Sequence, residues 1–230
     1  MNHQGSELLK GVRSGLPVGI GYLPIAAAFG TLALQSGIGA EETVLMSILV
    51  YAGASQFMAV GMLVSGAGAM QIIIATFFLN LRHLIMSMAV NRSIRTSSLA
   101  WKGLLSFGIT DETFALLTVE GQGQDQKLSL FFTAGVMSTA YLSWVIGTIL
   151  GGFGSRVIPS RISEGMAIGL YAMFIGLLAP NVRRFPKTGI IALLSMLFCY
   201  GFTRFLDQGW SIVLATVLGA TAGAIIIGRK

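Results

Sequence analysis

The chain has 230 residues, of which 54% are hydrophobic and only 10% are charged, and its mean hydropathy is +0.78. Soluble domains carry roughly 25% charged residues, and a folded chain of this size cannot bury so much apolar surface in one aqueous core. A soluble protein is therefore excluded. We interpret the net charge of +6 as loop charge of a membrane protein and expect no nucleic-acid binding.

Eight apolar segments follow a polar N-terminal tail, and short loops separate them. A helix needs about 20 apolar residues to cross a bilayer. The runs are continuously apolar and lack the period-2 alternation of a membrane barrel. The sequence therefore predicts an all-α polytopic membrane protein with residues 1–230 in a single domain. The eight segments cover residues 16–35, 43–65, 67–90, 104–119, 129–151, 164–180, 188–205 and 211–228.

The first and fourth segments differ from ordinary spanning helices. The first contains two prolines and three glycines, and the fourth contains a glycine and two adjacent carboxylates in a short stretch. Proline removes a backbone donor and glycine weakens a helix. We expect both segments to be discontinuous helices, which membranes tolerate only where the backbone is buried or lines a polar cavity.

The two interrupted segments begin stretches of similar hydropathy, which suggests a 3+3 inverted repeat with halves 12–92 and 100–184 and two extra helices in 187–228. Interrupted helices at matching positions of two halves indicate a transporter binding site. The alternative is a coincidence of hydropathy of the kind that any polytopic chain can show. The basic loops leave the orientation in the membrane open.

Polar side chains interrupt the third segment at Asn80, Arg82 and His83. Thr76, Asn80, His83 and Ser87 share one helix face, so this face should turn toward a cavity or a partner helix. Charged groups at membrane depth are costly and usually functional. The alternatives are that Arg82 extends its charge to the membrane interface and that His83 only packs.

The second segment contains YAGASQF, residues 51–57. Its run of small residues allows close helix packing, which is one interpretation. The other is an unwound stretch that exposes backbone groups, with Ser55 and Gln56 adding side-chain hydrogen bonds.

Asp111 and Glu112 are two further charged residues within an apolar segment, where a charge at membrane depth is costly. A buried carboxylate without a partner favours its neutral form and can carry a proton, whereas a nearby arginine keeps it ionised. The alternative role is helix capping by Thr110 or Asp111. Both roles are compatible, because a half-helix N-terminus also suits a substrate carboxylate.

Several sequence motifs that indicate enzymatic chemistry are absent. It contains no P-loop and no HExxH motif, and its imidazoles are limited to His3 and His83. The single cysteine, Cys199, cannot form an internal disulfide or a cysteine metal cluster. We therefore expect no cofactor, no metal site, no catalytic residues and no enzymatic activity.

In this order and spacing, the opening GLPVGIGYLPIAAAFG and the motifs YAGASQF, LNLRH and TDETF resemble the AzlC family. This family comprises the large subunits of LIV-E type branched-chain amino acid exporters, which confer azaleucine resistance. The resemblance implies export of valine, leucine and isoleucine, with methionine as a further candidate, across the bacterial cytoplasmic (inner) membrane. It also implies a small AzlD-type membrane subunit as a partner.

Our hypothesis is a secondary exporter driven by the proton gradient, and homo-oligomerisation is left open. The rivals are a small-solute channel, an accessory subunit, and an intramembrane enzyme using His83 with a serine or Asp111. The opening motif has Tyr22 where we would expect phenylalanine, which puts a role for its hydroxyl in doubt. The candidate proton-coupling residues are Asp111, Glu112 and His83. The candidate substrate-binding residues are Tyr22, Pro24, Ser55, Gln56, Asn80 and Arg82.

Overall fold

The computed structural model describes residues 3–94, 98–122, 127–154 and 178–228, together with positions 168, 172, 175 and 176. Over this part of the chain the regular structure is helical, apart from one isolated bridge between Ile94 and Leu128. The predicted sixth segment, 164–180, lies mostly outside the described residues.

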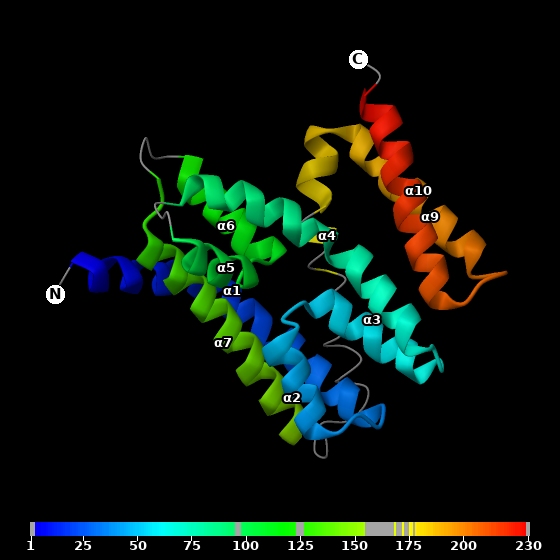
Figure 1. Cartoon of the computed structure of the whole chain (residues 1–230), viewed down its shortest axis with the longest axis horizontal. Helices are drawn as coiled ribbons and strands as arrows, with labels where there is room; N and C mark the ends of the chain where they lie inside the picture. The colour runs from blue at the N-terminus through cyan, green and yellow to red at the C-terminus, as the bar shows by residue number, and fades with distance from the viewer. Residues whose placement is uncertain are drawn as a thin grey trace. The chain divides into compact units, whose positions relative to one another are not determined.

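The described helices, coloured along the chain in Figure 1, are α1 (His3–Gln35), α2 (Ala40–Leu49), α3 (Gly53–Val64), α4 (Ala69–Ser93), α5 (Leu99–Phe107), α6 (Asp111–Gln122), α7 (Leu130–Gly154), α9 (Pro186–Phe202) and α10 (Gln208–Gly228). By length and composition, four of them can cross a membrane: α1, α4, α7 and α10. The shorter α3 and α9 are also apolar. The predicted class, a helical multi-pass membrane protein, is confirmed, and the count of eight crossings and the inverted repeat stay predictions.

The predicted interruption of the first segment is wrong, because α1 is one helix that contains Pro17 and Pro24. A spanning helix tolerates proline when neighbouring groups compensate for the lost backbone bond. The long α7 lies along α1 and packs closely against it, which supports the helix on both sides of its prolines.

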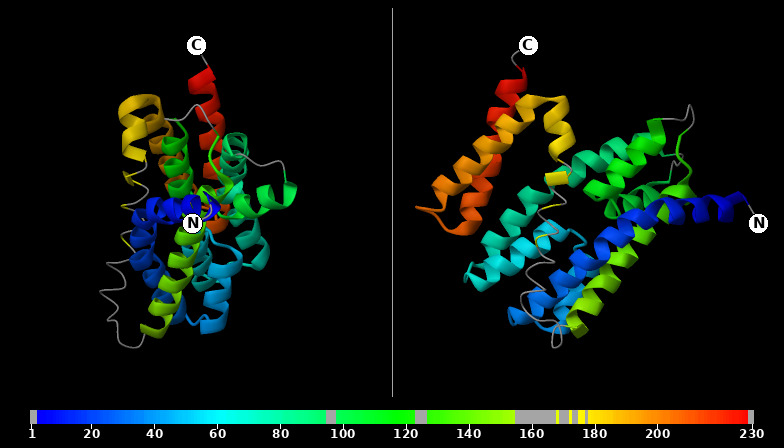
Figure 2. Two further views of the ribbon diagram at one scale, coloured as in Figure 1. Left: turned by 90° about the vertical axis from the view of Figure 1, so that its left-hand side faces the viewer. Right: turned by 180° about the vertical axis from the view of Figure 1, so that it is seen from behind.

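Small residues let α1 and α7 pack with their backbones in contact (Figure 2). A methyl group added at Gly15 would lie 3.0 Å from the Val136 carbonyl oxygen, and one at Gly147 would lie 2.7 Å from the Leu23 carbonyl oxygen. Thr31 donates to the Gly151 carbonyl at 3.0 Å. Contacts advance along both helices together, so α1 and α7 run parallel. If both cross the bilayer, the chain between them crosses it an odd number of times, which the second, third and fourth segments satisfy.

The second and fourth segments are both broken. In the second segment α2 ends at Leu49 and a new helix, α3, begins at Gly53. Tyr51, between these two helices, has a left-handed φ of 44°. The fourth divides into α5 and α6 around residues 108–110, as predicted. Both interpretations of YAGASQF therefore apply, because the chain unwinds before Gly53 and Gly53 itself packs against the Trp144 ring.

The chain forms two compact units. The first comprises Met1–Gln56 and Leu81–Ala167, and the second comprises Phe57–Asn80 and Ile168–Lys230. Within the second unit, α9 packs against α10, and Met62, Ala75 and Val213 form a small apolar core. Both breaks and all the polar contacts described next belong to the first unit.

Candidate functional site

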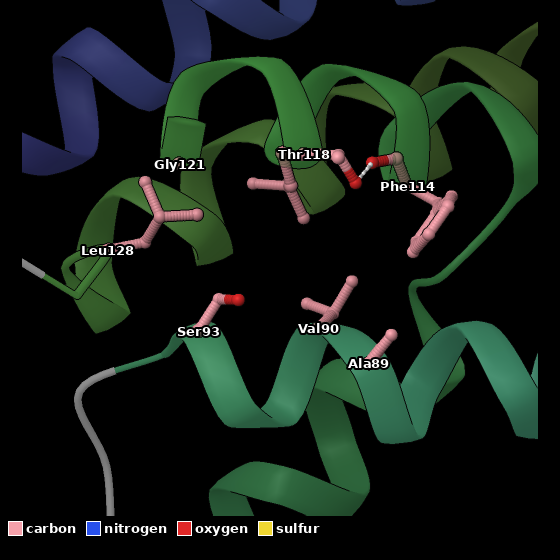
Figure 3. Close-up of a pocket in the computed structure, with 8 residues that line it drawn as sticks. Ala89, Val90, Ser93, Phe114, Thr118, Gly121 and Leu128 are labelled. Atoms are coloured by element: carbon pink, nitrogen blue, oxygen red, sulfur yellow. Dashed lines mark hydrogen bonds between the residues drawn. The ribbon is translucent and has the colours of Figure 1, made fainter. Parts of the chain in front are cut away.

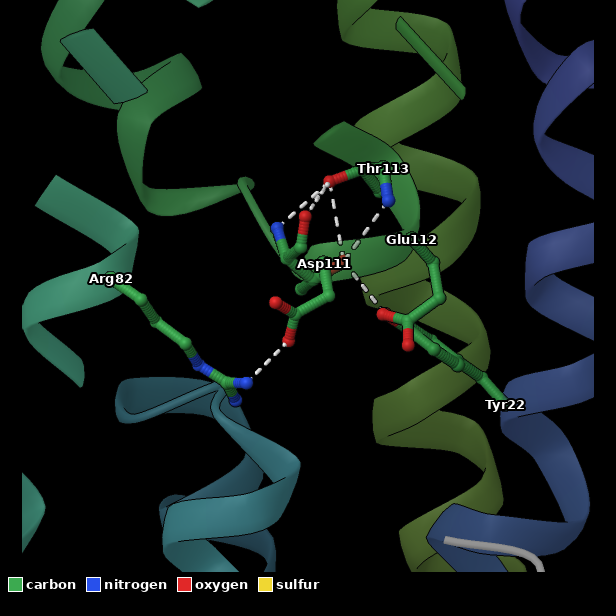
Figure 4. A network of polar contacts seen from close by, with 6 residues as sticks. Tyr22, Arg82, Asp111, Glu112 and Thr113 are labelled. Atoms are coloured by element: carbon green, nitrogen blue, oxygen red, sulfur yellow. Dashed lines mark hydrogen bonds and ion pairs between the residues drawn. The ribbon is translucent and has the colours of Figure 1, made fainter. Parts of the chain in front are cut away.

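The N-terminus of α6 is closed by two threonines in the first unit (Figure 4). The backbone N–H of Thr110 donates to Thr113 Oγ1 at 2.8 Å, and the N–H of Thr113 donates to Thr110 Oγ1 at 3.3 Å. This reciprocal arrangement is a capping box, which satisfies backbone donors that a helix start leaves open. The capping predicted for Thr110 is therefore present, and it places Asp111 and Glu112 in the first turn.

Glu112 contacts α1 through Tyr22. The buried Tyr22 hydroxyl lies 2.7 Å from Thr110 Oγ1 and also donates to Glu112 Oε2. A phenol has one proton, so it donates to one of these oxygens at a time. The helix N-terminus and the tyrosine together provide donors for a carboxylate, and these contacts join the first and fourth predicted segments.

Asp111 points toward α4 instead. Its Oδ2 lies 2.9 Å from Arg82 Nη1, and the two side chains are 23% and 34% exposed. Consecutive residues on an α-helix are turned by about 100°, which follows from 3.6 residues per turn. The two adjacent carboxylates therefore have different partners, and Figure 4 shows Arg82 and Tyr22 on opposite sides of the α6 start.

The break in the second segment places Tyr51 next to this cluster. Its ring packs edge-on against Tyr141 at 5.0 Å and lies 6.0 Å from the Phe107 ring. The Tyr141 hydroxyl donates to the Ile48 carbonyl at 3.0 Å, which satisfies one of the backbone acceptors at the end of α2. Tyr51 is close enough to Glu112 for the two groups to interact electrostatically.

A second series of hydrogen bonds begins at Trp144, whose ring packs against Tyr22. The Trp144 ring meets the Tyr22 ring edge-on at 5.3 Å, and its indole N–H donates to Gln56 Oε1 at 3.0 Å. Gln56 Nε2 donates to Ser47 Oγ at 2.9 Å, and Ser47 shares a hydrogen bond of 2.7 Å with Thr148. The protein thus uses both ends of the Gln56 amide.

The remaining candidate residues are His83, Pro24, Ser55 and Asn80. His83 is half-buried beside Arg82 and interacts electrostatically with Arg82 and Asp111. Pro24 is exposed on α1, and Ser55 is buried in the first turn of α3. Asn80 lies on α4 and belongs to the second unit.

The described residues of the first unit line cavities, of which two have linings that bear on the site. One, of about 240 Å³, lies between α6 and the C-terminal part of α4 and is lined by Val90, Phe114 and Leu117 among others (Figure 3). Phe114 follows Glu112 by two positions, about 200° around the helix, so this cavity faces away from Glu112. The other, of about 280 Å³, is lined by Thr43 and Thr148, which connects it to the series of hydrogen bonds through Gln56.

Sequence reasoning missed Tyr51 and gave Trp144 little weight. Both sit in apolar surroundings where an aromatic residue is usually core, so residue type alone gave little signal. The available signal for Tyr51 was its place before a run of small residues, where a break in the helix would turn it inward. Among the described residues no group of three His, Cys, Asp or Glu side chains could hold a metal ion.

This arrangement suits the binding of a small charged molecule or a proton. It combines an ion pair, a carboxylate held by a phenol and two helix breaks, all within apolar helices. Broken helices of this kind are the usual place where transporters bind ions and polar substrates.

The sequence model of the family described as "AzlC protein" matches residues 17–158, which include all the cluster residues. The chain is 30% identical to "Inner membrane protein YgaZ" of Escherichia coli (strain K12), over 96% of this chain and 89% of the relative. It is 32% identical to an "Uncharacterized membrane protein" of Archaeoglobus fulgidus, over 76% and 75% of the two chains. It is 27% identical to "Branched-chain amino acid transport protein AzlC" of Bacillus subtilis (strain 168), over 88% and 80%. No solved structure matches the chain at a significant level. The chain is thus a multi-pass membrane protein that belongs to the AzlC family.

Proposed function

We propose that this protein is a secondary transporter that exports branched-chain amino acids from the cytoplasm across the inner membrane. The observation that carries the proposal is the partly buried polar cluster at the start of α6, where Tyr22 and Arg82 contact two adjacent carboxylates among apolar helices. A protein places such groups in a membrane only at a cost, and they usually mark the path of an ion or substrate. The name of the Bacillus subtilis relative supports an amino acid as the substrate.

The substrate is a zwitterion with an aliphatic side chain. Its carboxylate needs a cation or backbone N–H groups, for which Arg82 and the start of α6 are available. Tyr22 also lies in this cluster, and substrate contacts by Pro24, Ser55, Gln56 and Asn80 stay part of the proposal. Its side chain needs an apolar pocket, for which the surroundings of Phe29, buried on α1, are one candidate.

We further propose coupling to the proton gradient, with Asp111, Glu112 and His83 as the candidate proton carriers. Glu112 suits this role best, because Asp111 already has Arg82 as an ionic partner. A carboxylate without a cationic partner can exchange a proton with less loss of structure than one that holds an arginine in place.

The chain would act as one domain over residues 1–230, as the large subunit beside a small membrane partner of the AzlD type. The test is counterflow of labelled leucine in liposomes that contain the purified chain with and without that partner. We expect saturable exchange that valine and isoleucine compete for. The absence of exchange in both preparations would reject the proposal, and a flux that rises linearly with leucine would favour a channel instead.

Proton coupling has a separate test in the same liposomes. An imposed pH gradient should drive net leucine movement, and an ionophore that collapses the gradient should abolish net movement while leaving counterflow intact. Net movement that persists after the gradient has collapsed would exclude proton coupling.

A further inference from the structure

Three buried side-chain oxygen atoms of the first unit have no hydrogen-bond partner among the described residues: Asn91 Oδ1, the Tyr51 hydroxyl and Glu112 Oε1. The last two belong to the cluster at the start of α6 and to the helix break beside it. Tyr51 is only 3% exposed, so its hydroxyl has no ready access to bulk solvent. Native proteins satisfy nearly all buried polar atoms, and an exception needs an explanation such as a bound group. Tyr51 packs against Phe107, the last residue of α5, and Glu112 lies in the first turn of α6 just after the break at residues 108–110, so one group bound beside this break can explain both.

The orientation of both side chains is fixed by the surrounding structure. Glu112 Oε2 is held by Tyr22, which leaves Oε1 as the oxygen available to a ligand. The Tyr51 ring is held by Tyr141 and Phe107, and its backbone has a left-handed φ of 44°. A non-glycine residue in this conformation is costly and is found preferentially at functional sites. Tyr51 is therefore kept in place despite an unfavourable backbone.

The electrostatics of this position favour a cation. Arg82 pairs with Asp111, so the neighbouring acid is neutralised while Glu112 has no described cationic partner. Tyr51 follows the C-terminal end of α2, where the helix dipole is negative. A carboxylate, a neutral phenol and a helix C-terminus all accept hydrogen bonds or attract positive charge.

The cation that fits is a primary ammonium group. An ammonium has three donors on a compact charge and can use several acceptors at once. A divalent metal ion would need six or more oxygen ligands, or a set of histidine and carboxylate ligands, and the described residues hold no such group.

We propose that Glu112 Oε1 and the Tyr51 hydroxyl form a subsite for the ammonium group of a small aliphatic amine or amino acid. The identification of this amine as the amino group of a transported branched-chain amino acid depends on the proposed function. The subsite itself predicts a binding property that can be measured without transport.

The binding test uses the full-length chain in detergent with isopentylamine, which is leucine without its carboxylate. Trp144 touches Tyr22 and serves as the reporter when the other two tryptophans are removed by Trp101→Phe and Trp210→Phe. We expect saturable quenching of Trp144 fluorescence by isopentylamine. 4-Methylvalerate, which is leucine without its ammonium group, should not displace the amine.

Substitutions in this background locate the subsite. Glu112→Gln should weaken isopentylamine binding by at least about tenfold, because a hydrogen bond to a charged group is lost. Tyr51→Phe should weaken it by about threefold to tenfold, the effect of a neutral hydrogen bond. The matched controls are Glu120→Gln, on the same helix, and Tyr200→Phe, whose side chain is 63% exposed, and both should bind as the parent does.

The outcomes of these binding and counterflow experiments test the subsite and the proposed function separately. If Glu112→Gln elutes as a folded protein and binds isopentylamine as tightly as Glu120→Gln, the subsite is overturned. The same holds if the parent shows no saturable binding. If amine binding depends on Glu112 but leucine counterflow is absent, the subsite stands and the amino acid transport function fails. If counterflow is present and amine binding is insensitive to both residues, the function stands and the subsite fails.

Discussion

The ion pair between Arg82 and Asp111 should stabilise the fold through a coupling that can be measured. Two unit charges 2.9 Å apart attract by about 6 kcal/mol at an effective dielectric constant of about 20. Desolvation cancels much of this energy, and the side chains are partly exposed, which weakens the pair further. We therefore expect a net coupling of about 1–2 kcal/mol, which is below the values for fully buried pairs.

A double-mutant cycle measures this coupling. The variants are Arg82→Gln, Asp111→Asn and the double substitution, unfolded with sodium dodecyl sulfate in mixed micelles and followed by circular dichroism. Each single variant removes one charge and leaves the other without this ionic partner, so each should be clearly less stable than the parent. The double variant removes both charges, and its loss of stability should be smaller than the sum of the single losses.

The pair of Glu7 and Lys10 on α1, of which Lys10 is exposed and Glu7 is 20% exposed, is the matched control. These residues lie 2.8 Å apart, one helical turn from each other, and the Lys10 side chain is 65% exposed. Such pairs contribute about 0.5 kcal/mol or less. A coupling between Arg82 and Asp111 no larger than that of the control pair would refute the reasoning, because it would mean that water screens both pairs equally.

Three further substitutions test the packing and the hydrogen bonds of the first unit. Gly147→Ala puts a methyl group 2.7 Å from the Leu23 carbonyl oxygen and should lower the thermal unfolding temperature of the purified protein, whereas Gly21→Ala meets nothing within 4 Å and should not lower it. Gly53→Ala puts a methyl group 2.5 Å from the Trp144 ring, so the emission of Trp144 in a single-tryptophan background should shift; an unchanged spectrum would contradict the contact. Tyr22→Phe removes the hydroxyl that donates to Glu112 and should slow leucine counterflow by about tenfold, the effect of one hydrogen bond to a charged group; an unchanged rate would show that this bond is not used.

The breaks in the helices show how far local sequence can predict this fold. The break around residues 108–110 was predictable, because a glycine and a capping threonine interrupt a short apolar segment. The break expected at Pro17 and Pro24 does not occur, because the support for α1 comes from α7, more than a hundred residues later. The local cost of the two prolines could be read from the sequence, but only the neighbouring helix decides whether α1 bends away or stays helical.

The sequence predicted which residues belong to the candidate site, but it did not predict which residue each of them contacts. Asp111 and Glu112 are adjacent in sequence, so nothing local distinguishes the carboxylate that holds Arg82 from the one that contacts Tyr22. Gln56 was a candidate for substrate contact, and in the structure its amide bridges Trp144 and Ser47.

The sequence by itself determined that this is a helical membrane protein, because hydropathy adds up over short runs of residues and needs no knowledge of contacts. It also identified the polar groups that are expensive at membrane depth. Only the tertiary structure decided what each group does, since its partner comes from a distant part of the chain: Tyr22 and Glu112 are 90 positions apart. The structure also made Tyr51 notable, because a buried hydroxyl without a described partner can be recognised only after the surrounding helices are in place.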